Sequence, residues 1–251
     1  MSESWLSYPW PRSFLPRQGQ ATRAQRRAIA AHWEAFGITL RYGESIELSA
    51  SFGREGRRVL EVGFGMGENL LHLARSHPDQ DIVGVEAHRP GVGALLLQVA
   101  AEGLTNVRVI HGDALYLLSY NLTGPTFDEV CVFFPDPWPR PKDHHRRFVR
   151  PETASLLGAR MRPGGVLNLA TDVEAYGHAM LEALDGTPGW CNAVGEGFTP
   201  RPDWRPVTAY EARGLAAGRA ARDVRYVWRP GGEEQGVLGA SKGVDVGSSA
   251  S

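Results

Sequence analysis

The chain has 251 residues and a formal net charge of -1 at pH 7, with 42% hydrophobic and 22% charged residues. A chain of this length and composition can bury a substantial core as one globular domain, which excludes a fibre and a wholly disordered chain. The near-zero net charge argues against a uniformly basic surface for binding nucleic acid.

Basic residues are nevertheless concentrated in three places. Residues 10–30 contain five arginines and no acid, residues 140–150 contain five basic residues and one acid, and residues 201–229 contain seven arginines and three acids. These stretches could converge on one polyanion, or they could form three separate solvated faces.

No apolar run in the sequence is long enough to span a bilayer, and the first thirty residues lack the apolar segment of a signal peptide. We therefore expect a cytoplasmic protein that does not enter a membrane. The two cysteines, Cys131 and Cys191, lie sixty residues apart and match no ligand-spaced pattern. This spacing predicts two buried thiols and no metal site.

The chain begins with a predicted arm rich in Pro, Ser, Trp and Arg, followed by a short amphipathic helix over residues 21–36. A regular alternation of strands and helices starts at residue 58 and predicts a parallel sheet with helices on both faces and ligands at the carboxyl ends of the strands. The predicted strands are 58–63, 81–86, 107–110, 129–134 and 166–170, and the predicted helices are 69–75, 91–102, 115–120, 151–161 and 173–184.

Two more strands are predicted near residues 190–194 and 224–228, at one edge of the sheet, where the pairing could be antiparallel. The predicted organisation is an arm and short helix over 1–40, an α/β domain over 41–229, and a Gly- and Ser-rich disordered tail over 230–251.

A glycine-rich loop follows the first main strand, with the pattern Glu61-Val-Gly63-Phe-Gly65-Met-Gly67. Glycines at such a turn let the backbone approach a ligand closely. A dinucleotide fingerprint would have glycine where this chain has Glu68, which disfavours a dehydrogenase.

Acidic residues also end the next two strands. Glu86 lies where ribose hydroxyls are bound in such folds, and Asp113 follows the third strand. Either acid could instead be solvated, and Asp113 could cap the helix that follows it.

The stretch FFPDPWPRPKDHHRR, residues 133–147, places one carboxylate, Asp136, between two prolines and next to a basic run. The prolines stiffen the loop and set the direction of that carboxylate. The alternative interpretation is a Pro-rich turn beside a charged surface patch.

Several blocks together resemble one family, the bacterial tRNA (guanine-N7-)-methyltransferases. These blocks are RSFLPRQGQATRAQ, LEVGFGMGENLLHLA, FFPDPW with its basic run, LATD, and RPVTAYEARGLAAG. The resemblance implies a Rossmann-like class I methyltransferase with a mostly parallel seven-stranded sheet, and S-adenosylmethionine as cofactor. It also implies tRNA as partner, no metal, and a monomer or homodimer that methylates N7 of a guanosine in the variable region. A small-molecule methyltransferase would not need the basic run, and a non-catalytic RNA-binding module is disfavoured by the intact acids.

The resemblance also implies residue roles. Asp136 would act at the reaction centre through charge and orientation, because guanine N7 needs no general base to become a nucleophile. The cofactor would contact Glu61, Gly63, Gly65, Glu86, Asp113 and Asp136. The acceptor guanosine would contact Arg140, Asp172, Thr208, Ala209, Tyr210 and Glu211. The phosphates of the tRNA would contact Lys142, Arg146 and Arg147.

Alternatives remain for individual residues. Trp138 could stack on a base or seat its loop in the core, Asp172 could cap the next helix, and Glu211 could pair with Arg213 or Arg205. The family usually has Lys where this chain has Arg140, and a denser basic string where it has Pro141, Lys142 and Asp143, so the contact at 140 is open. An exocyclic amine of an RNA base is the alternative methyl acceptor.

Overall fold

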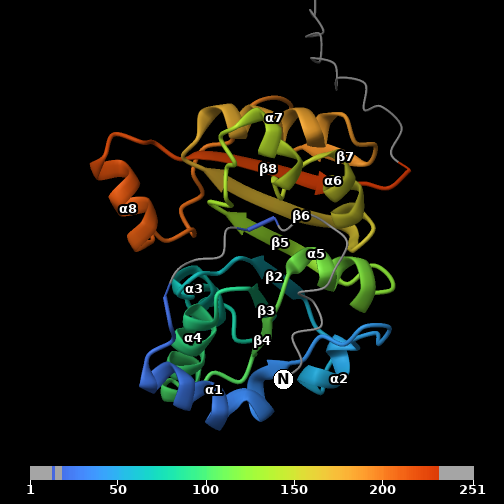
Figure 1. The fold of residues 1–251 in the computed structure, drawn as a ribbon. Coiled ribbons are helices and arrows are strands. Elements are labelled where there is room, and N and C mark those ends of the chain that lie inside the picture. The colour runs from blue at the N-terminus through green and yellow to red at the C-terminus, as the bar shows by residue number, and fades with distance from the viewer. Residues whose placement is uncertain (1–12, 15–18, 232–251) are drawn as a thin grey trace, which may run out of the picture.

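The computed structural model describes residues 13–14 and 19–231, so most of the predicted arm and almost all of the predicted tail lie outside the described residues. The described chain forms an eight-stranded sheet in the order β1-β4-β3-β2-β5-β6-β8-β7 (Figure 1). The strands are β1 (Gly37–Ile38), β2 (Arg58–Val62), β3 (Asp81–Glu86), β4 (Val107–His111), β5 (Phe127–Phe133), β6 (Met161–Thr171), β7 (Trp190–Asn192) and β8 (Arg222–Trp228).

The mostly parallel sheet is confirmed, and it has one strand more than the seven predicted. The additional strand β1 has two residues, which pair in parallel with Val109 and Ile110 of β4. So short a strand leaves no periodic pattern in the sequence. Strand β8 runs antiparallel to both β6 and β7, as the prediction for this edge allowed.

Helices cover both faces of the sheet (Figure 1). One layer contains α1 (Arg23–Phe36), α3 (Glu68–Ser76) and α4 (Arg89–Ala101). The other contains α2 (Leu48–Phe52), α5 (Ala114–Tyr116) with a π-helix (Leu117–Asn121), α6 (Pro151–Gly158) and α7 (Glu174–Asp185). A short 3-10 helix (Pro141–Arg146) and α8 (Ala209–Ala216) complete the described chain.

The central strands are buried on both faces, which explains why they are nearly continuous apolar runs. In β2, Val59 packs in the cluster under α3 and α4, whereas Leu60 and Val62 pack on the opposite side. Alternation along a strand therefore places Glu61 on the same face as Val59, beneath α3. In that layer Glu61 contacts the side chain of Asn69, which belongs to α3.

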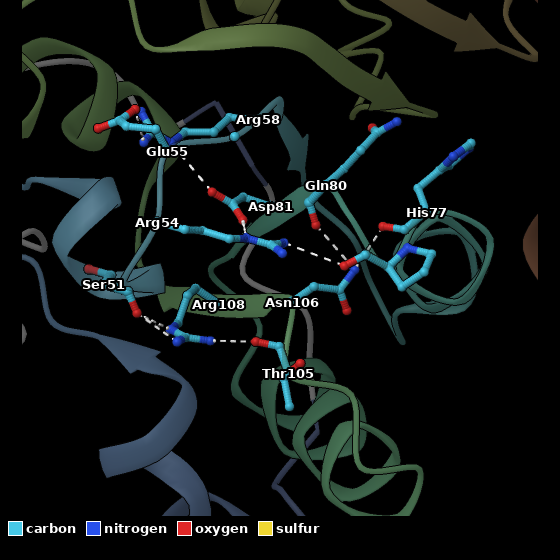
Figure 2. Close-up of polar contacts among 12 residues, drawn as sticks. Ser51, Arg54, Glu55, Arg58, His77, Gln80, Asp81, Thr105, Asn106 and Arg108 are labelled. Atoms are coloured by element: carbon cyan, nitrogen blue, oxygen red, sulfur yellow. Dashed lines mark hydrogen bonds and ion pairs between the residues drawn. The ribbon is translucent and has the colours of Figure 1, made fainter.

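The amino ends of the central strands are held by a network of arginines and buried polar groups (Figure 2). Asp81 is fully buried and accepts a hydrogen bond from Arg54 Nε at 2.7 Å, with Arg58 Nε at 3.8 Å. Asn106 Nδ2 lies within hydrogen-bonding distance of three backbone carbonyls, and Arg108 donates to the Ser51 carbonyl. This network fixes the amino ends of the central strands, opposite the candidate site at their carboxyl ends.

Two sequence predictions fail at the level of single residues. Cys131 is buried as expected, but Cys191 is exposed on the edge strand β7. Helix α6 ends at Gly158, and β6 begins at Met161, which the sequence pattern assigned to the helix. In the described part of the chain, no helix has the length and apolarity needed to cross a membrane.

Candidate active site

The glycine loop between β2 and α3 adopts a conformation that suits glycine. Gly63, Gly65 and Gly67 have φ values of 69°, 58° and 88°, in the left-handed region where other residues are strained. The N-terminus of α4 lies against this loop, because a Cβ at Gly91 would be 2.0 Å from the Gly65 carbonyl oxygen. The loop and α4 can therefore approach each other only with glycine at position 91.

Glu86, at the end of β3, ties this loop to the sheet. Its carboxylate accepts hydrogen bonds from the Gly65 N–H at 2.8 Å and from the His88 N–H at 2.7 Å. The side chain is buried, which makes these charge-assisted hydrogen bonds important for the loop.

Glu61 lies below the loop and is also buried. It accepts a hydrogen bond from Asn69 Nδ2 at 3.1 Å. The pKa of Glu61 is raised to about 8, mainly by burial and to a smaller extent by the charge of Glu86, against the hydrogen bond from Asn69. The Asn69 Oδ1 atom is buried without a hydrogen-bond partner among the described residues.

Asp113 follows β4 and caps the helix after it. Its side chain accepts a hydrogen bond from the Leu115 N–H at 2.7 Å, so the capping role considered from the sequence is present. Three buried acids, Glu61, Glu86 and Asp113, thus lie on neighbouring strands or directly after them.

The loop that carries Asp136 is strained on both sides of it. Phe134 and Trp138 have φ values of 53° and 45°, which cost non-glycine residues about 1–3 kcal/mol each. The Phe134 N–H donates to the Ala170 carbonyl at 2.7 Å and so continues the pairing of β5 with β6. Burial raises the pKa of Tyr176, and the charge of Asp136 adds to that shift.

Trp138 and two arginines hold the same loop in place. The indole of Trp138 is buried and donates to the Ser13 carbonyl at 3.3 Å, so it seats the loop in the protein. Arg146 stacks over the Trp138 ring at 3.6 Å from its centroid. Arg147 is buried, donates from Nε to the Pro137 carbonyl at 2.9 Å, and lies over the Tyr176 ring.

The other predicted basic contacts are accessible. Arg140 and Lys142 are exposed at the start of the 3-10 helix Pro141–Arg146, and Arg146 is half-buried by its stacking contact. The basic run therefore divides into residues that face solvent and one, Arg147, that supports the loop.

Asp172 follows β6 and contacts the C-terminal part of the chain. Its carboxylate accepts a hydrogen bond from Arg219 Nε at 2.8 Å, and the Tyr210 hydroxyl lies 3.5 Å away. Val173 is the N-cap residue of α7, so Asp172 does not take the capping position considered from the sequence.

Helix α8 contributes the last predicted residues. Thr208 caps it by accepting the Glu211 N–H, and the ring of Tyr210 lies 5.2 Å from that of Phe134. Glu211 is buried and paired with Arg205 at 2.6 Å, one of the two arginine partners considered from the sequence. Burial opposes ionisation of Glu211, but the hydrogen bonds and charges of Arg205 and Arg201 outweigh it and lower the pKa of Glu211.

The predicted residues therefore form two groups, one around the glycine loop and one around α8, and both groups adjoin the Asp136 loop. The parallel register pairs Val62 of β2 with Val132 of β5, so the glycine loop and the Asp136 loop leave the sheet side by side. Phe134 then connects to α8 through Tyr210. This arrangement suits the transfer of a group between two ligands, one beside each loop.

Comparison with known proteins agrees with this geometry. Residues 55–224 match the model of a family described as "Putative methyltransferase". The chain is 46% identical over 217 residues to the tRNA (guanine-N(7)-)-methyltransferase of Leifsonia xyli subsp. xyli, covering 86% of this chain and 95% of the relative. The enzyme of the same name from Alcanivorax borkumensis is 41% identical over 86% of this chain and 90% of its own length. The chain belongs to the tRNA (guanine-N(7)-)-methyltransferase family. It is a methyltransferase.

Solved structures of more distant methyltransferases share the fold of this family member. A 30S ribosomal A1408 methyltransferase from an uncultured bacterium superposes with a TM-score of 0.53 at 14% identity, covering 77% of this chain and 98% of that one. A 16S rRNA methyltransferase gives a TM-score of 0.51 at 15% identity, covering 87% and 99%. At such low identity these likenesses concern the fold alone.

Two residues of this methyltransferase's site, Arg219 and Glu68, escaped the sequence prediction, and so did the contact of Arg205 with Asp223. Arg205 bridges Glu211 and Asp223 in a buried cluster, Arg219 pairs with Asp172, and Glu68 accepts a hydrogen bond from the Ala209 N–H. The sequence signal that could have identified Glu68 is its position directly after the glycine loop. Among the described residues, no group of three or more His, Cys, Asp or Glu side chains is placed to hold a metal ion.

Proposed function

We propose that this methyltransferase transfers the methyl group of S-adenosylmethionine to N7 of a guanosine in the variable region of tRNA, in the cytoplasm. The observation that carries this proposal is the position of Asp136. Its strained loop leaves the sheet beside the glycine loop and contacts α8 through Phe134 and Tyr210. The relatives named above carry tRNA (guanine-N(7)-) methylation in their names.

The residues around the glycine loop fit this cofactor. Gly63 and Gly65, both at positive φ, would let the backbone approach it, and Glu86 would accept hydrogen bonds from its ribose hydroxyls. Asp113 would accept from the adenine amino group, and Glu61 would face the cationic methionine part. Each carboxylate already has a backbone or amide donor, but a carboxylate can accept several hydrogen bonds at once.

When bound, S-adenosylmethionine supplies a methyl group on a positively charged sulfur. Guanine N7 has an in-plane lone pair and no proton, so the protein need not remove a proton to create the nucleophile. Catalysis can then depend on holding N7 in line with the methyl group. The methylated base is cationic, so the Asp136 carboxylate would stabilise the charge that develops on it.

Asp172 would select guanine over adenine. A carboxylate can accept from both N1–H and N2–H of guanine, a pair of donors that adenine does not present. Asp172 is largely buried beside the Tyr210 hydroxyl, where such a pair would be shielded from water. We assign the remaining acceptor contacts to Arg140 and to the segment Thr208–Glu211.

The phosphates of the tRNA would be bound by the basic run. Lys142 and Arg140 are exposed, and Arg146 is half-buried with its guanidinium over the Trp138 ring. A phosphate contact by Arg147 would require this side chain to leave its buried position. The basic run would thus bind the backbone of tRNA next to the reacting base.

The proposal is tested with labelled S-adenosylmethionine and unmodified tRNA. The expected result is one methyl group per acceptor tRNA, at a position that borohydride and aniline cleave, because N7-methylguanosine is sensitive to this treatment. Methylation of an exocyclic amine would instead support the alternative acceptor. That alternative is disfavoured because Asp136 is followed by Pro137 and Trp138, whereas amine methyltransferases generally have two prolines and an aromatic residue. No transfer to tRNA would overturn the proposal.

A further inference from the structure

Glu68 connects two segments that are far apart in the sequence. It is the first residue of α3, directly after the glycine loop, and its Oε2 atom accepts a hydrogen bond from the backbone N–H of Ala209 at 2.7 Å, 141 residues away. Ala209 is the first residue of α8. A single exposed carboxylate therefore joins the start of the helix after the glycine loop to the start of α8.

This hydrogen bond completes the N-terminus of α8. The first N–H groups of a helix have no partner within the helix, and a carboxylate near them is favoured by the helix dipole. Thr208 accepts the N–H of Glu211, and Glu68 accepts the N–H of Ala209. The N-cap residue of α3 is Gly67, which has no side chain, so α3 receives no side-chain cap of its own.

The position of α8 matters for the proposed acceptor site. Figure 1 shows α8 at the edge of the molecule, outside the helical layers that cover the sheet. It carries Tyr210, which contacts the Phe134 ring and the Asp172 carboxylate. The Arg205–Glu211 pair ties α8 to β8 through Asp223, whereas the Glu68 hydrogen bond ties it to the cofactor half of the sheet.

We propose that Glu68 is a positioning residue that couples the glycine loop to α8, so that cofactor binding and acceptor binding support each other. A cofactor that orders the glycine loop would also fix Glu68, and Glu68 would then hold α8 and Tyr210 at the distance at which the acceptor base meets the methyl group. The inference rests on the proposed function for the identity of the two ligands. The hydrogen bond that carries it is independent of that function.

The two partners of this hydrogen bond can be removed separately. Glu68→Ala removes the acceptor, and Glu68→Gln keeps an acceptor oxygen without the charge. Ala209→Pro removes the donor, and proline is well tolerated at the first position of a helix. Thr208, which would precede the proline, is already extended, with φ −72° and ψ 160°, a conformation that the residue before a proline can adopt. Glu152→Gln, in the first turn of α6, is the matched control.

The first readout is kinetic. We expect Glu68→Ala and Ala209→Pro each to raise the KM for tRNA by about three- to tenfold, the size of a lost helix cap, with cofactor affinity in the absence of tRNA unchanged. Glu68→Gln should recover most of the loss, and Glu152→Gln should match the wild type. The double variant should be no worse than either single variant, because both remove the same hydrogen bond. Additive losses, or wild-type kinetics in Glu68→Ala, would overturn the inference.

The second readout does not depend on methyl transfer. Hydrogen exchange of residues 208–216 should slow when S-adenosylhomocysteine binds the wild-type protein, and this response should disappear in Glu68→Ala. An equal response in both proteins would overturn the coupling. If the wild-type protein shows the response but does not methylate tRNA, the proposed function fails while the coupling stands.

Discussion

Arg147 donates a hydrogen bond from Nε to the carbonyl oxygen of Pro137 at 2.9 Å, so a buried guanidinium supports the loop that carries Asp136. The sequence placed Arg147 with the phosphate contacts, because it belongs to a dense basic run. In the fold, its neighbour Arg146 stacks on Trp138, while Arg147 lies over Tyr176. The two arginines should therefore behave differently when they are replaced.

Replacement of Arg147 by glutamine should destabilise the loop and leave phosphate binding largely intact. We expect a loss of about 1–3 kcal/mol in the free energy of unfolding, because the Pro137 carbonyl loses a charged donor, together with a lower kcat. The salt dependence of tRNA binding should stay as in the wild type, whereas Lys142→Gln should reduce its slope by about one. A reduced slope with unchanged stability in Arg147→Gln would restore the phosphate contact predicted from the sequence.

Replacement of Asp136 by asparagine tests the catalytic proposal. The amide keeps the shape of the side chain but removes the charge that would stabilise the methylated base, so kcat should fall by about a hundredfold or more. Cofactor affinity, measured by titration calorimetry, should change by less than about threefold. Asp143→Asn removes a nearby acid from the exposed 3-10 helix and serves as the control. A near wild-type rate in Asp136→Asn would refute the proposed role.

The order of the main strands and helices could be predicted from the sequence, because a buried strand leaves an apolar run and a longer helix leaves its own period, whereas β1, α2 and α8 were not predicted. The carboxyl ends of β2 to β6 could be predicted to within one residue, and with them the positions of Glu86, Asp113 and Asp136. The capping contact of Asp113 was considered from its position before Leu115. These features depend on residues close together in the chain.

The closure of the site by the C-terminal segment could not be predicted in the same way. Arg205 is buried because it meets Glu211 and Asp223 after the chain has folded back over the sheet. The burial of Arg147 likewise depends on Tyr176, which comes from α7. The sequence does not show whether the partner of a basic residue is a phosphate or an acid far away in the chain. Only the fold shows which partner it has, and therefore which role.

Replacement of Asp81 by asparagine should affect stability without affecting catalysis. Asp81 is buried at the amino end of β3, opposite the site, against Arg54 and Arg58 (Figure 2). Removing the charge of Asp81 leaves the buried Arg58 Nε atom without the carboxylate that lies 3.8 Å from it. Arg54 is partly exposed, so we expect a moderate loss of about 2 kcal/mol.

The measurement is thermal and denaturant unfolding, combined with kcat per folded molecule at a temperature where the variant stays folded. Asp79→Asn, at an exposed position nearby, is the control and should unfold like the wild type. A lower kcat in folded Asp81→Asn would show that the arginine network reaches the active site.

Glu61 should make cofactor binding depend on pH. Burial raises its pKa to about 8 in the folded protein, so the carboxyl group is mostly protonated near neutral pH. A cationic ligand favours the carboxylate, and binding should therefore release a proton. Affinity should increase as pH rises from 6 through 8 and level off above that value, because above pH 8 no proton has to leave. Calorimetric titrations with S-adenosylmethionine in two buffers of different ionisation enthalpy would measure the released proton.

The same group should have the opposite effect on stability. Because the pKa of Glu61 is higher in the folded than in the unfolded chain, its protonated form stabilises the fold at low pH, and this contribution is lost as pH rises from 4.5 through about 8. Glu61→Gln keeps a neutral group of the same shape next to Asn69 and should remove both effects. Its unfolding free energy should depend less on pH than that of the wild type, and its cofactor affinity should no longer increase between pH 6 and 8. If both pH profiles survive in Glu61→Gln, another group carries the proton.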